Sequence, residues 1–324
     1  MEPLPRGAQF IRAKTLWEIA LDVAGDFSIP YTGDRDICIS IGSGSGESFR
    51  YALRMSVGSP VLAHAVVRGE LEMAFVNPSA LLTQAYRGVG LFPEPLPVRV
   101  VANYPSWDRY VQVIHPRTGI TSLAQVKEQR YPLRLSTRED PTHSTRVLIN
   151  QVLGIYGFSL DELLGWGGSL QLNGPPGDPR RLAAIEAGEV DAVFDEGIPQ
   201  WLDEALAHGY QPMIFEEPVF QQLQALGWRR VKVPAGRYPH VKEDIDCLDY
   251  GGWPLYTRAS LPDEWAYKVC AALQNRQAEI PWEAGAFTGI AQLGQDTDAT
   301  PLDVPLHPGA ARWYREQGYA VKEI

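Results

Sequence analysis

The chain has 324 residues, about twice the length of a typical domain, which excludes a single short module and predicts two lobes or one large α/β domain. Hydrophobic residues make up 45% of the chain and charged residues 21%, as in ordinary globular proteins, so we expect a sizeable core. The formal net charge is −10 and no run of lysine or arginine occurs, which excludes the charge pattern of a nucleic-acid-binding protein and disfavours anionic membrane surfaces.

The first six residues lack the basic and apolar regions of a secretory signal. As written, the sequence therefore predicts a cytoplasmic protein, whereas a trimmed exported precursor would be periplasmic or otherwise extracytoplasmic. Apolar side chains at helical spacing over residues 10–24 predict an amphipathic helix within an N-terminal extension, residues 1–30. The longest apolar stretches are shorter than a membrane span, which takes about 18 residues, so membrane insertion is not expected.

A first α/β unit follows this extension. Residues 36–41 predict a strand that ends in a Gly-Ser turn over residues 42–46. The later pattern predicts a helix over 47–57, a helix from residue 60, a strand over 72–76, a helix over 79–86, and strands over 98–103 and 110–115. Such alternation is typical of a mainly parallel sheet.

A second α/β unit begins after residue 119. Its pattern predicts strands over 133–136, 192–195 and 212–215, and helices over 144–156, 179–187 and 199–208. A strand-like stretch over 247–257, a helix over 262–277 and a terminal helix over 308–317 complete the chain. The predicted fold class is α/β.

The Gly-Ser turn over residues 42–46 has two interpretations. Glycine permits close approach of the backbone, and free N–H groups at the start of a helix attract anions, so the turn could hold a carboxylate. It lacks the lysine of a nucleotide-binding P-loop, and its third glycine comes one residue too early for a dinucleotide fingerprint. No cofactor is therefore expected, and the alternative is a turn that only reverses the chain.

A second helix start carries hydroxyl groups at Ser144 and Thr145. Simple capping would explain Ser144 alone, but two helix starts, one in each unit, could hold one ligand from both sides of a cleft. Arg50, Arg138 and Arg146 are candidate salt-bridge partners for a ligand carboxylate.

Two adjacent carboxylates, Asp195 and Glu196, close a predicted strand at the edge where open α/β sheets bind ligands. With Glu47 they could hold a ligand amine or hydroxyl, or act as general acid or base; a solvated turn is the alternative. Tyr104, Trp107 and Trp253 stand in predicted loops, where they could line a pocket or pack under the loop.

Metal and disulfide chemistry have no support in the sequence. The three cysteines are far apart, and the six histidines show no paired metal-ligand spacing. The sequence also lacks the GxSxG motif that is typical of many hydrolases. We expect neither a metal site nor a disulfide framework.

Several phrases resemble the TAXI-type solute receptors of TRAP transporters, an NMT1-like group with the type II periplasmic-binding-protein fold. They are ISIGSGSG over 39–46, RGELEMAFV over 68–76, GITSL over 119–123, GEVDAVF over 188–194, VPAGRYP over 233–239 and, most specifically, PLHPGAARWY over 305–314. The resemblance extends from about residue 36 to residue 319.

This resemblance implies two lobes joined by two crossing strands, with residues 31–115 and 246–324 in lobe 1 and residues 116–245 in lobe 2. It also implies that the family's ligand loops fall on Ser43, Gly44, Ser45, Asn77, Tyr104, Ser144, Thr145, Asp195 and Glu196. With the residues argued above, the complete predicted ligand set adds Glu47, Trp107, Arg138 and Trp253.

The leading hypothesis is a protein that binds a small carboxylate-containing solute, an amino acid or organic acid, between its lobes. It would act as a TAXI-like receptor with TRAP membrane subunits as candidate partners, or as a relative without a signal. The alternative is a cytosolic decarboxylase or biosynthetic enzyme on the same scaffold, acting on an aromatic or heterocyclic acid with Glu47, Asp195 or Glu196 as acid or base. A cytosolic sensor subunit is a third interpretation.

Overall fold

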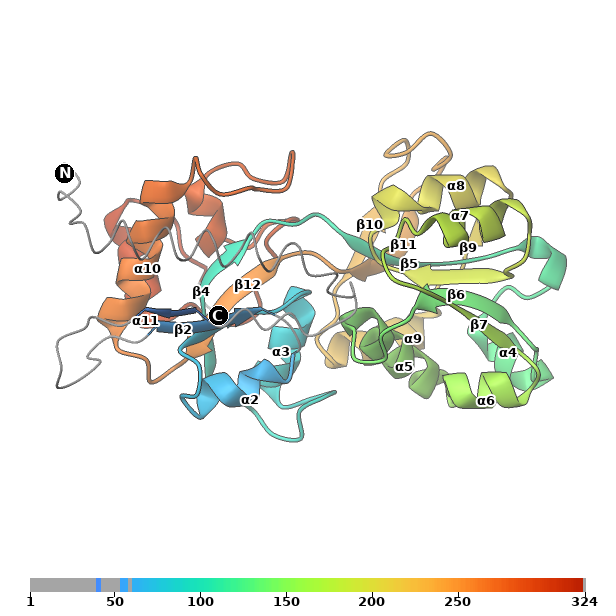
Figure 1. Cartoon of the computed structure of the whole chain (residues 1–324), viewed down its shortest axis with the longest axis horizontal. Coiled ribbons are helices and arrows are strands. Elements are labelled where there is room, and N and C mark those ends of the chain that lie inside the picture. Colours follow the sequence, from blue (N-terminus) through green and yellow to red (C-terminus); the bar gives the residue numbers. More distant parts are fainter. Residues whose placement is uncertain (1–38, 42–52, 58–59, 323–324) are drawn as a thin grey trace. The chain divides into compact units, whose positions relative to one another are not determined.

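A computed structural model describes residues 39–41, 53–57 and 60–322. The first of its two sheets has the order β1–β2–β3–β12–β4, formed by β1 (Ile39–Ile41), β2 (Leu53–Val57), β3 (Met73–Phe75), β12 (Trp253–Arg258) and β4 (Val98–Tyr104) (Figure 1). β2 and β3 are parallel, whereas β12 is antiparallel to both of its neighbours.

The second sheet has the order β10–β11–β5–β8–β6–β7, with β9 paired to β5. Its strands are β5 (Arg109–Ile114), β6 (Arg134–Arg138), β7 (Ser169–Asn173), β8 (Ala192–Asp195), β9 (Gln211–Pro212), β10 (Arg230–Val233) and β11 (Ile245–Asp249). β6 is parallel to β7 and β8, and the pairings of β5 are antiparallel. Both sheets are therefore mixed, and the expectation of a mainly parallel sheet was wrong.

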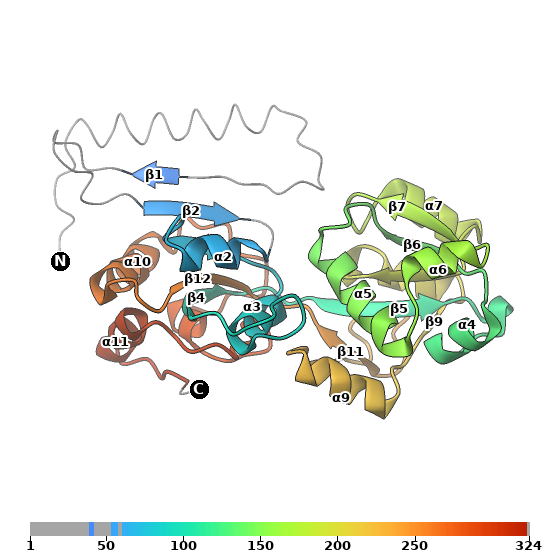
Figure 2. The same ribbon diagram turned by 90° about the horizontal axis from the view of Figure 1, so that it is seen from below.

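The helices divide between the two sheets. Those that contact the first sheet are α2 (Leu62–Val67), α3 (Ser79–Arg87), α10 (Asp263–Arg276) and α11 (Pro308–Glu316). Those of the second α/β unit are α4 (Leu123–Gln129), α5 (Ser144–Tyr156), α6 (Leu160–Gly165), α7 (Pro179–Glu186), α8 (Leu202–Ala207) and α9 (Glu217–Ala225). Figure 2 brings α5 and α6 in front of the second sheet. Short 3₁₀ helices occur at Pro116–Thr118, Ile198–Gln200 and Ile290–Gly294.

The chain passes between the sheets twice. The first crossing, residues 105–108, follows β4 and leads into β5, and the second, residues 250–252, follows β11 and leads into β12. The predicted fold class, α/β with two lobes and two crossing strands, is confirmed. The predicted lobe division assigned residues 109–115 and 246–249 to lobe 1, but their strands β5 and β11 pair in the second sheet.

Two local predictions were wrong. The helix expected over 47–57 is replaced over its last five residues by β2, whose pairing with β1 and β3 outweighs the local pattern. The single strand expected over 247–257 is two strands, because the second crossing interrupts it. Part of the prediction cannot be compared: the N-terminal helix over 10–24 and the Gly-Ser turn lie outside the described residues. No helix in the described part of the chain is long and apolar enough to cross a membrane.

Gly252 shapes the second crossing. Its φ of +77° is a left-handed conformation, and a Cβ atom there would lie 2.3 Å from Ser79 Oγ and 2.9 Å from Asn103 Oδ1. Gly236 has almost the same φ, +76°, with open space at its Cβ position. We therefore expect Gly252→Ala to lower the free energy of unfolding by about 1 kcal/mol more than Gly236→Ala. Urea unfolding of both variants measures the difference, and equal losses would contradict crowding at this crossing.

Candidate functional site

Helix α5 begins at Ser144, where the sequence predicts it. His143 caps the helix, and its ring Nδ1 accepts a hydrogen bond of 3.2 Å from the Thr145 N–H. Apolar residues at helical spacing bury one face of the helix, which ends at Gly157 in a left-handed conformation. The local sequence therefore fixes the hydroxyl groups of Ser144 and Thr145 in the first turn.

Tyr250, from the second crossing, contacts both hydroxyl groups. Its phenol oxygen lies 3.0 Å from Thr145 Oγ1 and is also hydrogen-bonded to Ser144 Oγ. The ring is fully buried and stacks on Trp228, with the ring centroids 6.5 Å apart. Burial raises the pKa of Tyr250 above its ordinary value, so the phenol keeps its proton and can donate it in a hydrogen bond. Tyr250 thus connects the second crossing to the start of α5.

The carboxylates at the end of β8 are paired with arginines inside the protein. Asp195 has no exposed surface; its Oδ1 lies 3.0 Å from Arg138 Nε, and its Oδ2 forms an ion pair with Arg181 Nη1. Arg138 also pairs with Glu196. Burial lowers the pKa of Arg181, which pairing with Asp195 opposes. In this structure Arg138 and Arg181 therefore neutralise the predicted ligand contacts Asp195 and Glu196.

The two crossings are hydrogen-bonded to each other. The Tyr250 N–H donates to the Asp108 carbonyl at 3.1 Å, and the Gly252 N–H donates to the Ser106 carbonyl at 3.1 Å. Asn77 joins them from the loop after β3, because its side-chain amide donates to the Gly252 carbonyl at 3.1 Å. Asp108 in turn accepts a hydrogen bond from the Gly197 N–H, directly after Asp195 and Glu196.

The aromatic residues of the predicted site lie beside the crossings. Tyr104 and Trp253 are opposite each other in the pairing of β4 with β12. The ring of Tyr104 packs 5.0 Å from that of Trp282, and burial raises its pKa to about 12. Trp253 is 39% exposed, and Trp107 donates its indole N–H to Asp298 at 2.5 Å.

The structure connects many of the predicted residues through the crossings. Contacts with the crossings or with one another link Asn77, Arg138, Ser144, Thr145, Asp195 and Glu196. Trp107 lies in the first crossing itself, and strand pairing places Tyr104 beside Trp253. Arg146 donates to the Arg138 carbonyl at 2.8 Å. Ser43, Gly44, Ser45, Glu47 and Arg50 lie outside the described residues.

Sequence reasoning missed Asp108 and Tyr250. The signal for Tyr250 is the Gly251-Gly252 pair that follows it, which marks a break in the strand-like stretch. No sequence pattern around Trp107 and Arg109 marks Asp108 as a site residue. The Gly197 N–H, from which it accepts a hydrogen bond, is 89 residues away in the chain.

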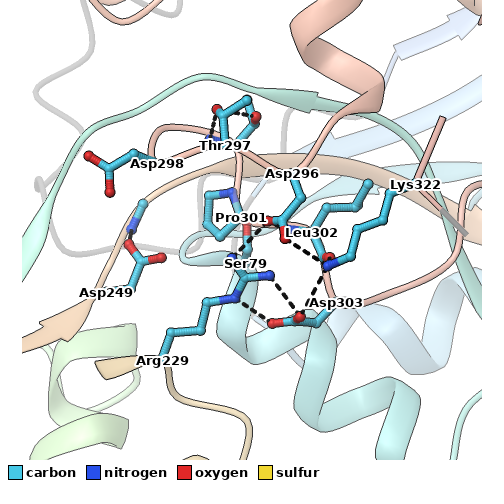
Figure 3. A network of polar contacts seen from close by, with 12 residues as sticks. Ser79, Arg229, Asp249, Asp296, Thr297, Asp298, Pro301, Leu302, Asp303 and Lys322 are labelled. Carbon is cyan, nitrogen blue, oxygen red and sulfur yellow. Dashed lines mark hydrogen bonds and ion pairs between the residues drawn. The ribbon is translucent and has the colours of Figure 1, made fainter. Parts of the chain in front are cut away.

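Figure 3 shows a separate network of charges around Arg229. Arg229, just before β10, pairs with Asp303 and Asp296, each at 2.7 Å, and Lys322 pairs with Asp296 at 2.7 Å. A small pocket is lined there by Ser79, Ala80, Gly227, Arg229, Asp249, Gly251, Pro301 and Asp303. Across residues 60–322 and the two short described strands, no group of three potential metal ligands of the His, Cys, Asp and Glu types occurs.

Comparison with known proteins identifies the family. The model of the NMT1-like family matches residues 37–318. The chain belongs to the NMT1-like family. The predicted membership of the NMT1-like group is thereby confirmed, whereas the assignment to the TAXI type remains a prediction.

Solved structures resemble this NMT1-like protein only distantly. XAC2383 from Xanthomonas citri bound to chloride ion is 12% identical, with 79% of this chain and 78% of that chain covered and a TM-score of 0.37. The alkanesulfonate-binding protein SsuA from Xanthomonas axonopodis pv. citri bound to MOPS is 14% identical, with 79% and 70% covered and a TM-score of 0.30. The L-cystine solute receptor of Neisseria gonorrhoeae in the unliganded open conformation is 15% identical, with 74% and 73% covered and a TM-score of 0.27. Likenesses of this size do not identify a ligand.

Proposed function

We propose that this protein is a two-lobe receptor that binds a small solute carrying a carboxylate, an amino acid or organic acid, beside the two crossings. The observation that carries the proposal is the meeting of predicted ligand residues from both lobes around Tyr250: Asn77 at its backbone carbonyl and Ser144 and Thr145 at its hydroxyl. In its finer form, the proposal is a TAXI-like receptor that delivers the solute to TRAP membrane subunits from outside the cytoplasm.

The start of α5 is the proposed contact for the ligand carboxylate. The first N–H groups of a helix lack partners within the helix, and the helix dipole favours an anion there. The Thr145 N–H donates its hydrogen bond to His143. Among residues 60–322, no group accepts a hydrogen bond from the backbone N–H of Ser144 or of Arg146. The Ser144 and Thr145 hydroxyls would turn from Tyr250 toward the ligand.

The enzyme alternative gains no support from the described residues. A general acid or base has to reach its substrate, but Asp195 has no exposed surface and pairs with two arginines. Glu47 lies outside the described part of the chain.

The proposal is tested by thermal denaturation of the full chain in the presence of single amino acids and organic acids. A compound at 100 times its dissociation constant should raise the free energy of unfolding by about 2.7 kcal/mol, with a matching rise in melting temperature. The Ser144→Ala/Thr145→Val double variant should lose at least tenfold in affinity for that compound, because both hydroxyl donors are removed.

Thr142→Val is the matched control, because Thr142 is exposed and its hydroxyl contacts Asp140 instead of Tyr250. This variant should bind as the unaltered protein does. If no amino acid or organic acid at millimolar concentration changes the melting temperature, the proposed function is wrong.

A further inference from the structure

Asp108 lies in the first crossing, and two backbone N–H groups donate hydrogen bonds to its side-chain carboxylate. The Arg109 N–H donates to Oδ1 at 2.7 Å, and the Gly197 N–H lies 3.0 Å from both Oδ1 and Oδ2. An ionised carboxylate offers about four acceptor positions, so two N–H donors leave capacity for another donor. Within the described ranges, Asp108 forms no ion pair, and its residue remains partly exposed.

The surroundings of Asp108 are negative and poorly hydrated. Desolvation raises the pKa of its carboxyl to about 7; the two backbone hydrogen bonds oppose this shift, and the charges of Asp195 and Glu283 add to it. A carboxylate in such a place favours a cation as its next partner.

The nearby cations already have other partners. The Arg109 guanidinium lies 3.0 Å from Asp249 and also pairs with Asp298, and Arg237 stacks over the Trp107 ring at 4.2 Å. Asp195 and Glu196, the carboxylates predicted to hold a ligand cation, are paired with Arg138. Asp108 is therefore the carboxylate at the crossings that a ligand cation could neutralise.

Tyr250 links Asp108 to the proposed carboxylate contact. Its N–H donates to the Asp108 carbonyl at 3.1 Å, and its phenol oxygen lies 3.0 Å from Thr145 Oγ1. The backbone of Asp108 and the first turn of α5 are thus separated by the length of one tyrosine residue. A molecule whose acid and amine are several bonds apart fits this separation, for example an amino acid that carries a second carboxylate at the end of its side chain, such as L-glutamate.

We infer that Asp108 binds an ammonium group of the solute, so that the ligand of this protein is an amino acid or related zwitterion instead of a simple organic acid. This inference rests on the proposed function. The ammonium would donate to the acceptor positions that Arg109 and Gly197 leave open and would supply the missing positive charge.

The test compares amino acids with the acids that lack only the amine, for binding to the full chain by isothermal titration calorimetry. The pairs are L-glutamate with glutarate, L-leucine with 4-methylpentanoate, and L-phenylalanine with 3-phenylpropionate. The unaltered protein should bind one of the amino acids at least tenfold more tightly than its partner acid. Asp108→Asn should remove this preference while leaving the affinity for the acid within about threefold. Asp161→Asn, at an exposed position, is the control and should keep the preference for the amino acid.

A pH titration of the unaltered protein does not depend on how the variant folds. The amino acid should bind about tenfold more weakly at pH 6 than at pH 8, since a carboxyl with a pKa of about 7 is mostly protonated at pH 6. The other groups that face it are Asp195, Glu283, Tyr238 and Arg109, so the partner acid, measured over the same range, corrects for their titration. Equal affinities for the two members of every pair, or an unchanged preference in Asp108→Asn, would overturn the inference and leave the proposed function standing. Binding of neither class would overturn the proposed function itself.

Discussion

Asp195→Ala is expected to lower the free energy of unfolding by about 3–5 kcal/mol. Asp195 has no exposed surface and pairs with Arg138 and Arg181, which are 1% and 0% exposed. Removing one partner of a buried ion pair leaves the other charge unpaired where water does not reach it, and this strongly destabilises the folded state. Chemical denaturation in urea at pH 7.5 measures the loss.

Glu264→Ala is the control for this prediction. Glu264 pairs with Lys268 at 2.6 Å on the exposed surface of α10, and such pairs contribute little because water screens them. The control should unfold at the same urea concentration as the unaltered protein. A loss below about 1 kcal/mol in Asp195→Ala would contradict a structural role for the cluster, as would an effect on ligand affinity without an effect on stability.

Helix α5 could be predicted because its signals are local. The α5 segment shows this: hydroxyl residues at its start, apolar residues at helical spacing and Gly157 at its end all lie within 14 residues. Each of these signals acts on its immediate neighbours in the chain. The prediction of the helix start, and of the hydroxyls placed there, needed no knowledge of the rest of the fold.

The partners of the site residues could not be predicted, because they are far away in the sequence. Arg138 lies 57 residues before Asp195, Thr145 lies 105 residues before Tyr250, and Asp108 lies 89 residues before Gly197. A single sequence does not say which charges meet. The carboxylates of β8 were therefore interpreted as ligand contacts, although the fold supplies their arginines.

The prediction for the segment that forms β2 was wrong for a related reason. The sequence over 47–57 was interpreted as a helix, but Leu53–Val57 pairs with β1 on one side and β3 on the other. Strand formation depends on the neighbouring strands more than helix formation depends on neighbouring helices. The same dependence explains why β7 and β10, whose pairing partners lie elsewhere in the chain, had no counterpart in the predicted elements.

His143→Asn is expected to make the protein less sensitive to acid. Burial lowers the pKa of His143 to about 4, and the charge of Arg138 adds to the shift, while Asp195 and Asp140 oppose it. The neutral ring accepts the Thr145 N–H through Nδ1, which a protonated ring cannot do. In the unfolded chain the pKa is about 6.5, so the unfolded state takes up the proton first as the pH falls.

The stability that His143 contributes is therefore complete above pH 6.5 and is lost as the pH falls from about 6.5 toward 4. At pH 5 the loss from this residue should reach about 2 kcal/mol relative to pH 7.5. Asparagine does not titrate and is a favourable N-cap, so the variant keeps an acceptor for the Thr145 N–H without this loss. Urea unfolding of both proteins at pH 7.5, 6 and 5 should give a difference that grows in favour of the variant as the pH falls. Parallel stability curves would show that His143 is not held neutral at the start of α5.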